Sequence, residues 1–167
     1  RDAGGGQSFF ELDADGFRQV LDLNLLGTVL PAQVFGSAMV HGNIGDGAIV
    51  TISSMAAQRA LTRVAGYSAA KGAIDAFTRW LAVDLARSFG SGIRVNAISA
   101  GPVKTASARG IPGFSSMVEM FGERAPLKDT FNAKDVAQLA VFLASDGAKA
   151  ITAETIFVDN GYHAMGM

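Results

Sequence analysis

Tyr67 and Lys71 are the two residues of this chain whose types and spacing most directly suggest chemistry. They are four positions apart, so on a helix both side chains lie on one face, one turn from each other. An ammonium group beside a phenol favours the phenolate form of that phenol. A tyrosine tuned in this way can pass a proton at neutral pH, as interconversion of a carbonyl and an alcohol requires. A surface tyrosine on an ordinary helix has the same spacing from a lysine, so the flanking sequence has to decide.

The flanking sequence alternates between patterns typical of strands and of helices. The apolar run from Ala48 to Ile52 predicts a buried strand that ends just before Ser54, thirteen residues ahead of Tyr67. Pro31 predicts a kink or an offset start in the helix that contains it. This alternation predicts a parallel α/β sheet. The other elements that we expect are helices at about Gly16–Met39, Tyr67–Phe89 and Ala133–Leu143, strands at Ile93–Ile98 and Ile156–Val158, and a long connection from Ala100 to Thr130.

Composition favours a core-rich globular chain and gives no sign of a charged partner. The 167 residues suit one domain, 49% of them are hydrophobic and the formal net charge is −1. Nothing in that charge balance suggests nucleic acid or a membrane surface as a partner. The chain has no cysteine, which fits a reducing cytosol, so we predict a cytoplasmic protein. We find no apolar run of transmembrane length and expect no membrane partner.

Four residues, taken in order, resemble the short-chain dehydrogenase/reductase (SDR) family. They are Asn24 within LNLLG, Ser54 within TISS, and Tyr67 and Lys71 within YSAAK, and the resemblance runs from Ala3 to Gly161. It implies a doubly wound, Rossmann-like parallel sheet and an oxidoreductase that uses NAD or NADP. It also implies a small-molecule carbonyl or alcohol substrate and a homodimer or homotetramer.

The resemblance implies a catalytic role for each of these four residues. Tyr67 would be the general acid/base, and Lys71 would favour its phenolate and hydrogen-bond the nicotinamide ribose. Ser54 would hold the substrate oxygen, while its neighbour Ser53 would be a loop cap. Asn24 would complete a proton relay through a water molecule to Lys71.

Two further segments match positions at which the family binds its cofactor. The turn GPVKT follows the second predicted strand, and in the family its Val backbone meets the nicotinamide carboxamide and its Thr the carboxamide or the phosphates. RDAG at the start aligns with the family's Asn-Asn-Ala-Gly turn, with Arg1 and Asp2 in place of the two Asn residues. The implied cofactor-binding residues are Ala3, Gly4, Tyr67, Lys71, Gly101, Pro102, Val103 and Thr105.

The family's Gly-rich phosphate loop has no counterpart in this sequence. That loop seats a pyrophosphate at a helix N-terminus, and Gly4 to Gly6 do not open a helix at once. We therefore expect residues 1–167 to be the C-terminal part of a single SDR Rossmann domain in a longer protein. Its first βα units would be absent, and its substrate loop would cover about residues 100–130.

Two subfamilies are resembled in different parts of the chain. The N-terminal half is similar to sugar-acid oxidoreductases of the mannonate/fructuronate type, and NAISAGPVKT and VDNGYHAMGM are similar to enoyl-acyl-carrier-protein reductases. Those reductases usually place six residues between Tyr and Lys, whereas this chain has three. We therefore favour carbonyl–alcohol chemistry, with reduction of an enoyl or 3-oxoacyl thioester in fatty-acid synthesis as an alternative. A non-catalytic, truncated SDR that serves as an oligomerisation or binding module is a further alternative.

Three smaller features complete the expectations. His41 and His163 are interpreted as solvated side chains, and no residue pair has metal-ligand spacing. Ala153 stands in ITAE where the family usually has Gly. Apolar Phe77 and Trp80 on the Tyr67 helix are expected either in the core or at the helical dimer interface of the family.

Overall fold

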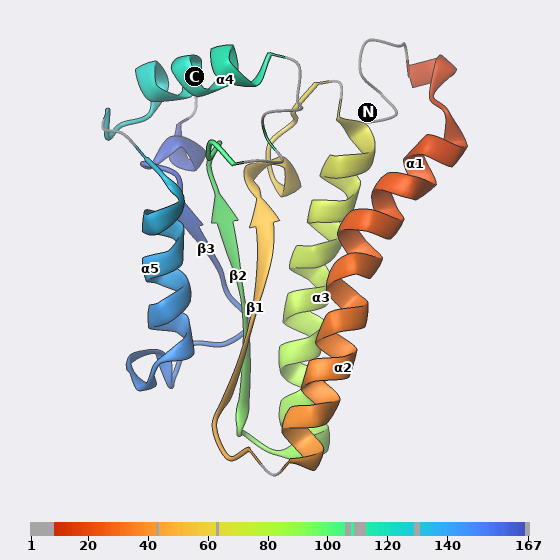
Figure 1. Cartoon of the computed structure of the whole chain (residues 1–167), viewed down its shortest axis with the longest axis vertical. Coiled ribbons are helices and arrows are strands. Elements are labelled where there is room, and N and C mark those ends of the chain that lie inside the picture. The colour runs from red at the N-terminus through yellow and green to blue at the C-terminus, as the bar shows by residue number, and fades with distance from the viewer. Residues whose placement is uncertain are drawn as a thin grey trace.

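The chain forms a three-layer α/β/α arrangement around a parallel sheet. We describe it from a computed structural model, which places residues 9–42, 44–62, 64–105, 108, 113–128 and 131–165. The sheet has the order β1–β2–β3, formed by Gly47–Ser54, Ile93–Ala100 and Thr155–Val158. Helices α2 and α3 cover one face of the sheet and α5 covers the other, as Figure 1 shows. The parallel α/β sheet expected from the sequence is therefore confirmed.

One long helix runs from Ala14 to His41 and changes its pitch near Asn24. It consists of α1 (Ala14–Leu21), a π-helical turn η2 (Asp22–Leu26) and α2 (Gly27–His41). The side chain of Asp13 caps its start by accepting from the backbone N–H groups of Asp15 and Gly16. Pro31 lies inside α2 and has no N–H to donate to the carbonyl oxygen one turn earlier, while the wider turn η2 is closed by a bond from the N–H of Gly27 to the carbonyl oxygen of Asp22.

This helix corrects one expectation from the sequence. By length and mean hydropathy (1.4), Ala14–His41 qualifies as a candidate membrane span, although we found no apolar run of that length. A single helix of this kind is weak evidence, because the core helix of a soluble protein passes the same test. Its apolar character comes partly from exposed residues of α2, among them Leu30, Val34 and Phe35.

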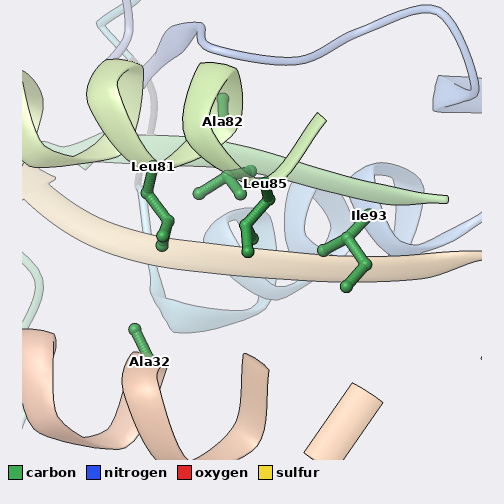
Figure 2. Close-up of a cluster of buried hydrophobic side chains, with 6 residues drawn as sticks. Ala32, Leu81, Ala82, Leu85 and Ile93 are labelled. Carbon is green, nitrogen blue, oxygen red and sulfur yellow. The ribbon is translucent and has the colours of Figure 1, made fainter. Parts of the chain in front are cut away.

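Helix α3 (Ala65–Phe89) lies along the sheet and supplies half of the buried residues of the first core cluster. Figure 2 shows Leu81, Ala82 and Leu85 of α3 close to Ile93 of β2. Ala32 faces them from the neighbouring helix α2 and belongs to the same cluster. Residues spaced by three and four along a helix share one face, which explains why this set is buried together. Helix α3 is thereby fixed against β1 and β2 along much of its length.

The second core cluster lies between α5 (Ala133–Ala144) and the other face of the sheet. It contains Ile98, Leu143 and Ala148, each with no measurable exposure. Asn132 and Asp135 form a reciprocal capping box at the start of α5. At the far end, the buried Arg94 guanidinium donates to the carbonyl oxygens of Leu143 (2.6 Å) and Ala148 (3.2 Å), which satisfies helix-terminal acceptors.

The carboxyl ends of the three strands are covered by short elements and by α4. Helix α4 (Phe114–Arg124) crosses this end of the sheet (Figure 1) and lies within the long connection expected over residues 100–130. The parts of that connection at 106–107, 109–112 and 129–130 lie outside the described residues. The remaining short helical turns are η1 (Phe9–Glu11), η3 (Met55–Ala57), η5 (Asp146–Ala148) and η6 (Tyr162–Ala164).

Ala153 adopts a left-handed backbone conformation, with φ of +66°. This region is disfavoured for a residue with a Cβ and is taken most readily by glycine. The backbone N–H of Ala153 donates to the carbonyl oxygen of Val95 at 2.7 Å, which joins the approach to β3 to strand β2. The glycine that the family usually has at this position would adopt the same turn without strain.

Candidate active site

Ser54 is the last residue of β1 and lies at the carboxyl end of the sheet. Its Oγ accepts a hydrogen bond from the backbone N–H of Ala56 (3.2 Å), which starts the turn η3. Because the oxygen accepts this bond, the hydroxyl proton remains free to be donated to a bound ligand. The sequence assigned the cap to Ser53, which is wrong. Parallel pairing continues to Ser54, and Ser53 lies buried within the strand, where its Oγ has no hydrogen-bond partner among the described residues.

Tyr67 lies in the first turn of α3 and is partly exposed. The preceding residue, Gly66, is buried against α1, and a Cβ there would lie 3.3 Å from Val20 and 3.4 Å from the ring of Phe17. The absence of a side chain at Gly66 therefore lets α1 approach the start of α3 closely. This contact fixes the end of the helix that carries the tyrosine.

Lys71 lies one turn further along α3, and only 8% of the residue is exposed. Its Nζ donates to the carbonyl oxygen of Ile52 (2.7 Å) and lies 5.5 Å from the centroid of the Tyr67 ring. Burial lowers the pKa of Lys71 below its ordinary value of 10.5, and the negative charge of Asp75 opposes that change. The predicted placement of Tyr67 and Lys71 on one helix face is therefore confirmed in geometry.

Asn24 lies in the π-helical turn and lines the same hollow as Lys71. Its Nδ2 donates to the carbonyl oxygen of Val20 (3.0 Å), and its backbone carbonyl oxygen accepts from the hydroxyl of Thr28 (2.8 Å). The hollow has a volume of about 490 Å³ and follows β1 beneath η2 and α2. Residues that are 47 positions apart in the sequence thus share one cavity wall, as the relay assigned to Asn24 requires.

The GPVKT segment follows β2 directly, at the same end of the sheet. The backbone N–H of Gly101 donates to the carbonyl oxygen of Val158 (3.0 Å), and a Cβ on Gly101 would lie 2.7 Å from the ring of Phe121. Glycine is therefore required if α4 is to pack on this turn.

The other cofactor-binding candidates lie near this turn or outside the described residues. The hydroxyl of Thr105 accepts from the N–H of Ala108 (3.2 Å). Pro102 and Val103 are partly buried beside Gly101, whereas the cofactor-binding candidates Ala3 and Gly4 lie outside the described residues.

A pairing between Asp159 and His163 at the end of β3 was missed by sequence reasoning. The carboxylate of Asp159 (3% exposed) accepts from the Nδ1 of His163 (2.9 Å) and from the backbone N–H groups of Gly161 and His163. The imidazole ring stacks on Phe157 with a centroid distance of 3.8 Å. The prediction that His163 is solvated is therefore wrong, whereas His41 is exposed as expected. The four-residue spacing in VDNGYH was the available signal.

The His163 segment is also tied to the loop beyond Ser54. The guanidinium of Arg59 donates to the carbonyl oxygen of His163, across 104 positions of sequence. The ring of Tyr162 stacks on Phe121 of α4 at 4.9 Å. The loop after β1, the turn after β3 and helix α4 therefore form one connected rim above the strand ends.

Taken together, these features define the class of protein. A parallel sheet carries a serine at the end of β1, and the next helix carries a tyrosine and a buried lysine beside that strand. A helical asparagine lines the same cavity as the lysine. This arrangement has the Rossmann-like architecture that the resemblance to the SDR family implied.

The family model described as "Enoyl-(Acyl carrier protein) reductase" matches residues 2–163. The chain belongs to this family.

Individual relatives agree with this assignment. The enoyl-[acyl-carrier-protein] reductase [NADH] FabI of Bacillus cereus is 37% identical over 158 residues, which are 95% of this chain and 59% of that protein. The chain thus spans about three fifths of the length of this curated relative. A crystal structure of the Bacillus cereus enoyl-acyl carrier protein reductase with NADP+ and indole naphthyridinone matches with a TM-score of 0.87 and 36% identity. The match covers 99% of this chain and 62% of the chain in that crystal structure.

A second group of solved structures has the same fold. A gluconate 5-dehydrogenase from Burkholderia cenocepacia, in complex with NADP and tartrate, matches with a TM-score of 0.80 and 26% identity, over 95% of this chain and 60% of that one. The enoyl-reductase resemblance of the C-terminal half is confirmed by the family match. The resemblance of the N-terminal half to mannonate/fructuronate oxidoreductases is not supported by these matches.

Proposed function

We propose that this chain is part of an NAD(P)-dependent oxidoreductase that transfers hydride between a nicotinamide and a carbonyl or secondary alcohol. The observation that carries the proposal is the buried ammonium of Lys71, held on the carbonyl oxygen of Ile52 one turn from Tyr67. Burying a charged lysine costs free energy unless its N–H groups are hydrogen-bonded. Such a buried ionisable group indicates a catalytic or binding site more strongly than a purely structural role.

Each side chain then has a definite task in the direction of reduction. The hydroxyl of Tyr67 donates its proton to the carbonyl oxygen of the substrate, and the hydroxyl of Ser54 donates a hydrogen bond to the same oxygen. The positive charge of Lys71 stabilises the phenolate that remains on Tyr67. Asn24, in the wall of the shared cavity, holds the water through which Lys71 returns the proton. The carbonyl carbon gains a hydride and its oxygen a proton, so the product is the alcohol.

The residues present fit the nicotinamide end of a dinucleotide. Lys71 has three N–H donors, of which the carbonyl oxygen of Ile52 takes one, so two remain for ribose hydroxyls. Gly101, Pro102, Val103 and Thr105 would line the nicotinamide from the turn after β2, and Ala3 and Gly4 from the start of the chain. The bound coenzyme would supply the hydride. The relatives support this choice, because their names and titles specify NADH in one case and NADP in others.

Reduction of an enoyl thioester is the second candidate, and the family match supports it. One feature of the chain argues against it. Six intervening residues before Lys71 would place a tyrosine at position 64, which is Val64 in this chain. With Tyr67 three residues nearer to the lysine, the proton donor fits a carbonyl oxygen better than an enoyl group. A 3-oxoacyl thioester satisfies both the family match and the Tyr–Lys spacing.

We also propose that the protein assembles as a homodimer or homotetramer through α2 and α3. Six large apolar side chains are exposed on these helices, and a hollow of about 360 Å³ lies between them. Exposed apolar area of this extent marks an interaction surface. We call it the α2–α3 surface; its exposed residues are Leu30, Val34, Phe35, Trp80, Val83 and Phe89.

The domain assignment and the location are proposals as well. Residues 1–167 form the C-terminal part of one SDR Rossmann domain, with a substrate loop at about 100–130, in a cytoplasmic enzyme. The match to about three fifths of its relatives' length supports the first of these proposals.

One assay separates the candidate functions. The protein, expressed from its complete open reading frame, is offered an acetoacetyl thioester or a crotonyl thioester, each with NADH and then with NADPH. We expect oxidation of the coenzyme with the 3-oxoacyl substrate and little with the enoyl one. The reverse preference would establish the enoyl reductase. No turnover with either thioester, or with a panel of sugar-acid ketones, would favour the non-catalytic binding module.

A further inference from the structure

Asp75 is a buried carboxylate on the same face of α3 as Lys71, and the reaction described above does not use it. It lies four residues after Lys71, so the two side chains are one helical turn apart. Only 5% of Asp75 is exposed. A carboxylate at such a position costs free energy unless it is hydrogen-bonded or paired with a cation.

Hydrogen bonding alone gives a weak reason for a charge at this place. In the described part of the chain, the side chain of Asp75 accepts from one donor, the hydroxyl of Thr155 on β3, at 3.3 Å. A neutral amide would accept that bond equally well. The neighbouring polar residue on this face, Thr78, is satisfied by a neutral bond to the hydroxyl of Thr51 (2.7 Å).

The buried cation available to Asp75 is Lys71. Arg94 is also buried, but its guanidinium donates to carbonyl oxygens at the end of α5, on the opposite face of the sheet. Burial lowers the pKa of Lys71, and the charge of Asp75 acts in the opposite direction. The two groups make no ion pair within 4.0 Å among the described residues, so they interact through the protein interior.

Among the described residues, the elements packed on α3 bring no second buried carboxylate to Lys71, and His41, the titratable residue of α2, is exposed. Tyr67 is its titratable neighbour on α3 itself. Strand β1 and turn η3 contain no titratable residue, and the charged residue of β2 is Arg94. In α1 and η2 the charged side chains, Asp15, Arg18 and Asp22, are exposed. Asp75 is therefore the carboxylate that partly offsets the effect of burial on Lys71.

We propose that Asp75 is a positioning residue that keeps Lys71 charged without occupying its N–H donors. A direct ion pair would hold the ammonium and take up donors that a ligand needs. A carboxylate one turn away stabilises the same charge at a distance, because the interior screens it poorly. The proposal rests on the function proposed above as regards catalysis, but the charge of Lys71 can be measured independently.

The test is an NMR titration of the lysine side chains. The lysine ¹³Cε signals are observed after selective labelling, and the signal missing in Lys71→Arg identifies Lys71. In Asp75→Asn, we expect the midpoint of Lys71 to fall by about one pH unit, the size expected for loss of one charge at a helical turn's distance. In Asp75→Glu the midpoint should return towards that of the unaltered protein.

Thr155→Val is the matched control for a structural role. It removes the hydroxyl bonded to Asp75 and keeps the carboxylate, so the Lys71 midpoint should stay where it was. Equal shifts in Asp75→Asn and Thr155→Val, or none in either, would overturn the proposal. Asp75→Leu, which removes the charge with a different shape, should give the same shift as Asp75→Asn and serves if the asparagine variant does not fold.

The catalytic consequence is read separately. If the protein reduces ketones, kcat/KM is expected to decline at high pH. In Asp75→Asn this decline should begin at a lower pH, together with the Lys71 midpoint. If the unaltered protein reduces nothing, the proposed function fails, while the titration still decides the role of Asp75.

Discussion

The ammonium of Lys71 and the carbonyl oxygen of Ile52 are joined by a 2.7 Å hydrogen bond across 19 positions of sequence. This bond ties the helix that carries Tyr67 to the strand that carries Ser54, two residues beyond Ile52. The two groups proposed to bind the substrate oxygen are thereby held by one connection. Rotation of Lys71 would alter both the charge near Tyr67 and the attachment of α3 to β1.

Replacement of Tyr67 by phenylalanine tests the proton donor. Tyr67→Phe keeps the ring and removes the hydroxyl, so we expect the rate of ketone reduction to fall by about 10²- to 10⁴-fold, the usual contribution of a positioned acid. Coenzyme oxidation is the measurement. The chain has one other tyrosine, and Tyr162→Phe, which keeps the stacking on Phe121, should leave the rate nearly unchanged. Retention of more than a tenth of the activity in Tyr67→Phe would contradict the mechanism.

The lowered pKa of Lys71 predicts how stability depends on pH. Between the lowered pKa in the folded protein and 10.5 in the unfolded chain, the unfolded state binds the extra proton. The free energy of unfolding therefore rises with pH in this window, because the cost of burying a charged lysine is removed as Lys71 loses its proton. Below the window that cost is present in full.

Lys71→Met should remove this contribution. Denaturant unfolding at a series of alkaline pH values should give a less positive slope for Lys71→Met than for the unaltered protein. Lys134→Met on the exposed start of α5 is the control, and its slope should match that of the unaltered protein. Parallel curves for all three proteins would show that Lys71 is not costly to bury.

Ala153→Gly should stabilise the fold. The left-handed conformation costs an alanine about 1 to 2 kcal/mol, and the greater freedom of glycine in the unfolded chain takes back part of the gain. We expect a net increase of about 0.5 to 1 kcal/mol in the free energy of unfolding. Ala148→Gly, at a fully buried position in η5 where no left-handed φ occurs, should be destabilising. A loss of stability in both variants would mean that the methyl group of Ala153 outweighs the strain.

Assembly through the α2–α3 surface can be tested by introducing one negative charge on that surface. Trp80 is 59% exposed and stacks on Phe77, so Trp80→Glu should place a carboxylate on the surface and shift the protein towards monomer in sedimentation velocity. The far-UV circular dichroism should stay unchanged, since little of the core is altered. Val141→Glu, at a residue of α5 that is 71% exposed, is the matched control. An unaltered sedimentation coefficient for Trp80→Glu would exclude this surface.

The sequence predicted the layers well and the interactions less completely. Apolar runs of strand length and apolar stripes of helical period located the elements that position the site, because those patterns reflect burial on one or both faces. The ends differed: β1 and β2 extend two residues further than expected, because parallel hydrogen bonding continues after the apolar run stops. The π-helical turn has no hydrophobic signature and was not predicted from the sequence.

Within the site, spacing along the sequence predicted which residues share one helix face, but it did not predict contacts between elements that are distant in the sequence. The pairing of Tyr67 with Lys71 follows from helical periodicity. The bond from Lys71 to Ile52 depends on how α3 lies against β1, which no spacing encodes. The substitution at Ala153 could be recognised from the ITAE pattern, but its cause became clear only from the positive φ. The Asp159–His163 pair was overlooked because a histidine near the chain end was assumed to be solvated.

The π-helical turn around Asn24 has a consequence for how this protein can change in evolution. Such a turn holds one residue more than an α-helical turn but completes about the same rotation. It therefore takes up the additional residue without changing the angle between α1, which presents Phe17 and Val20 to Gly66, and α2, which exposes Leu30 and Val34. Deletion of one residue from the turn would give a regular α-helix and leave both faces in place. The length of this segment can thus change more readily than the residue at position 24, to which the relay is assigned.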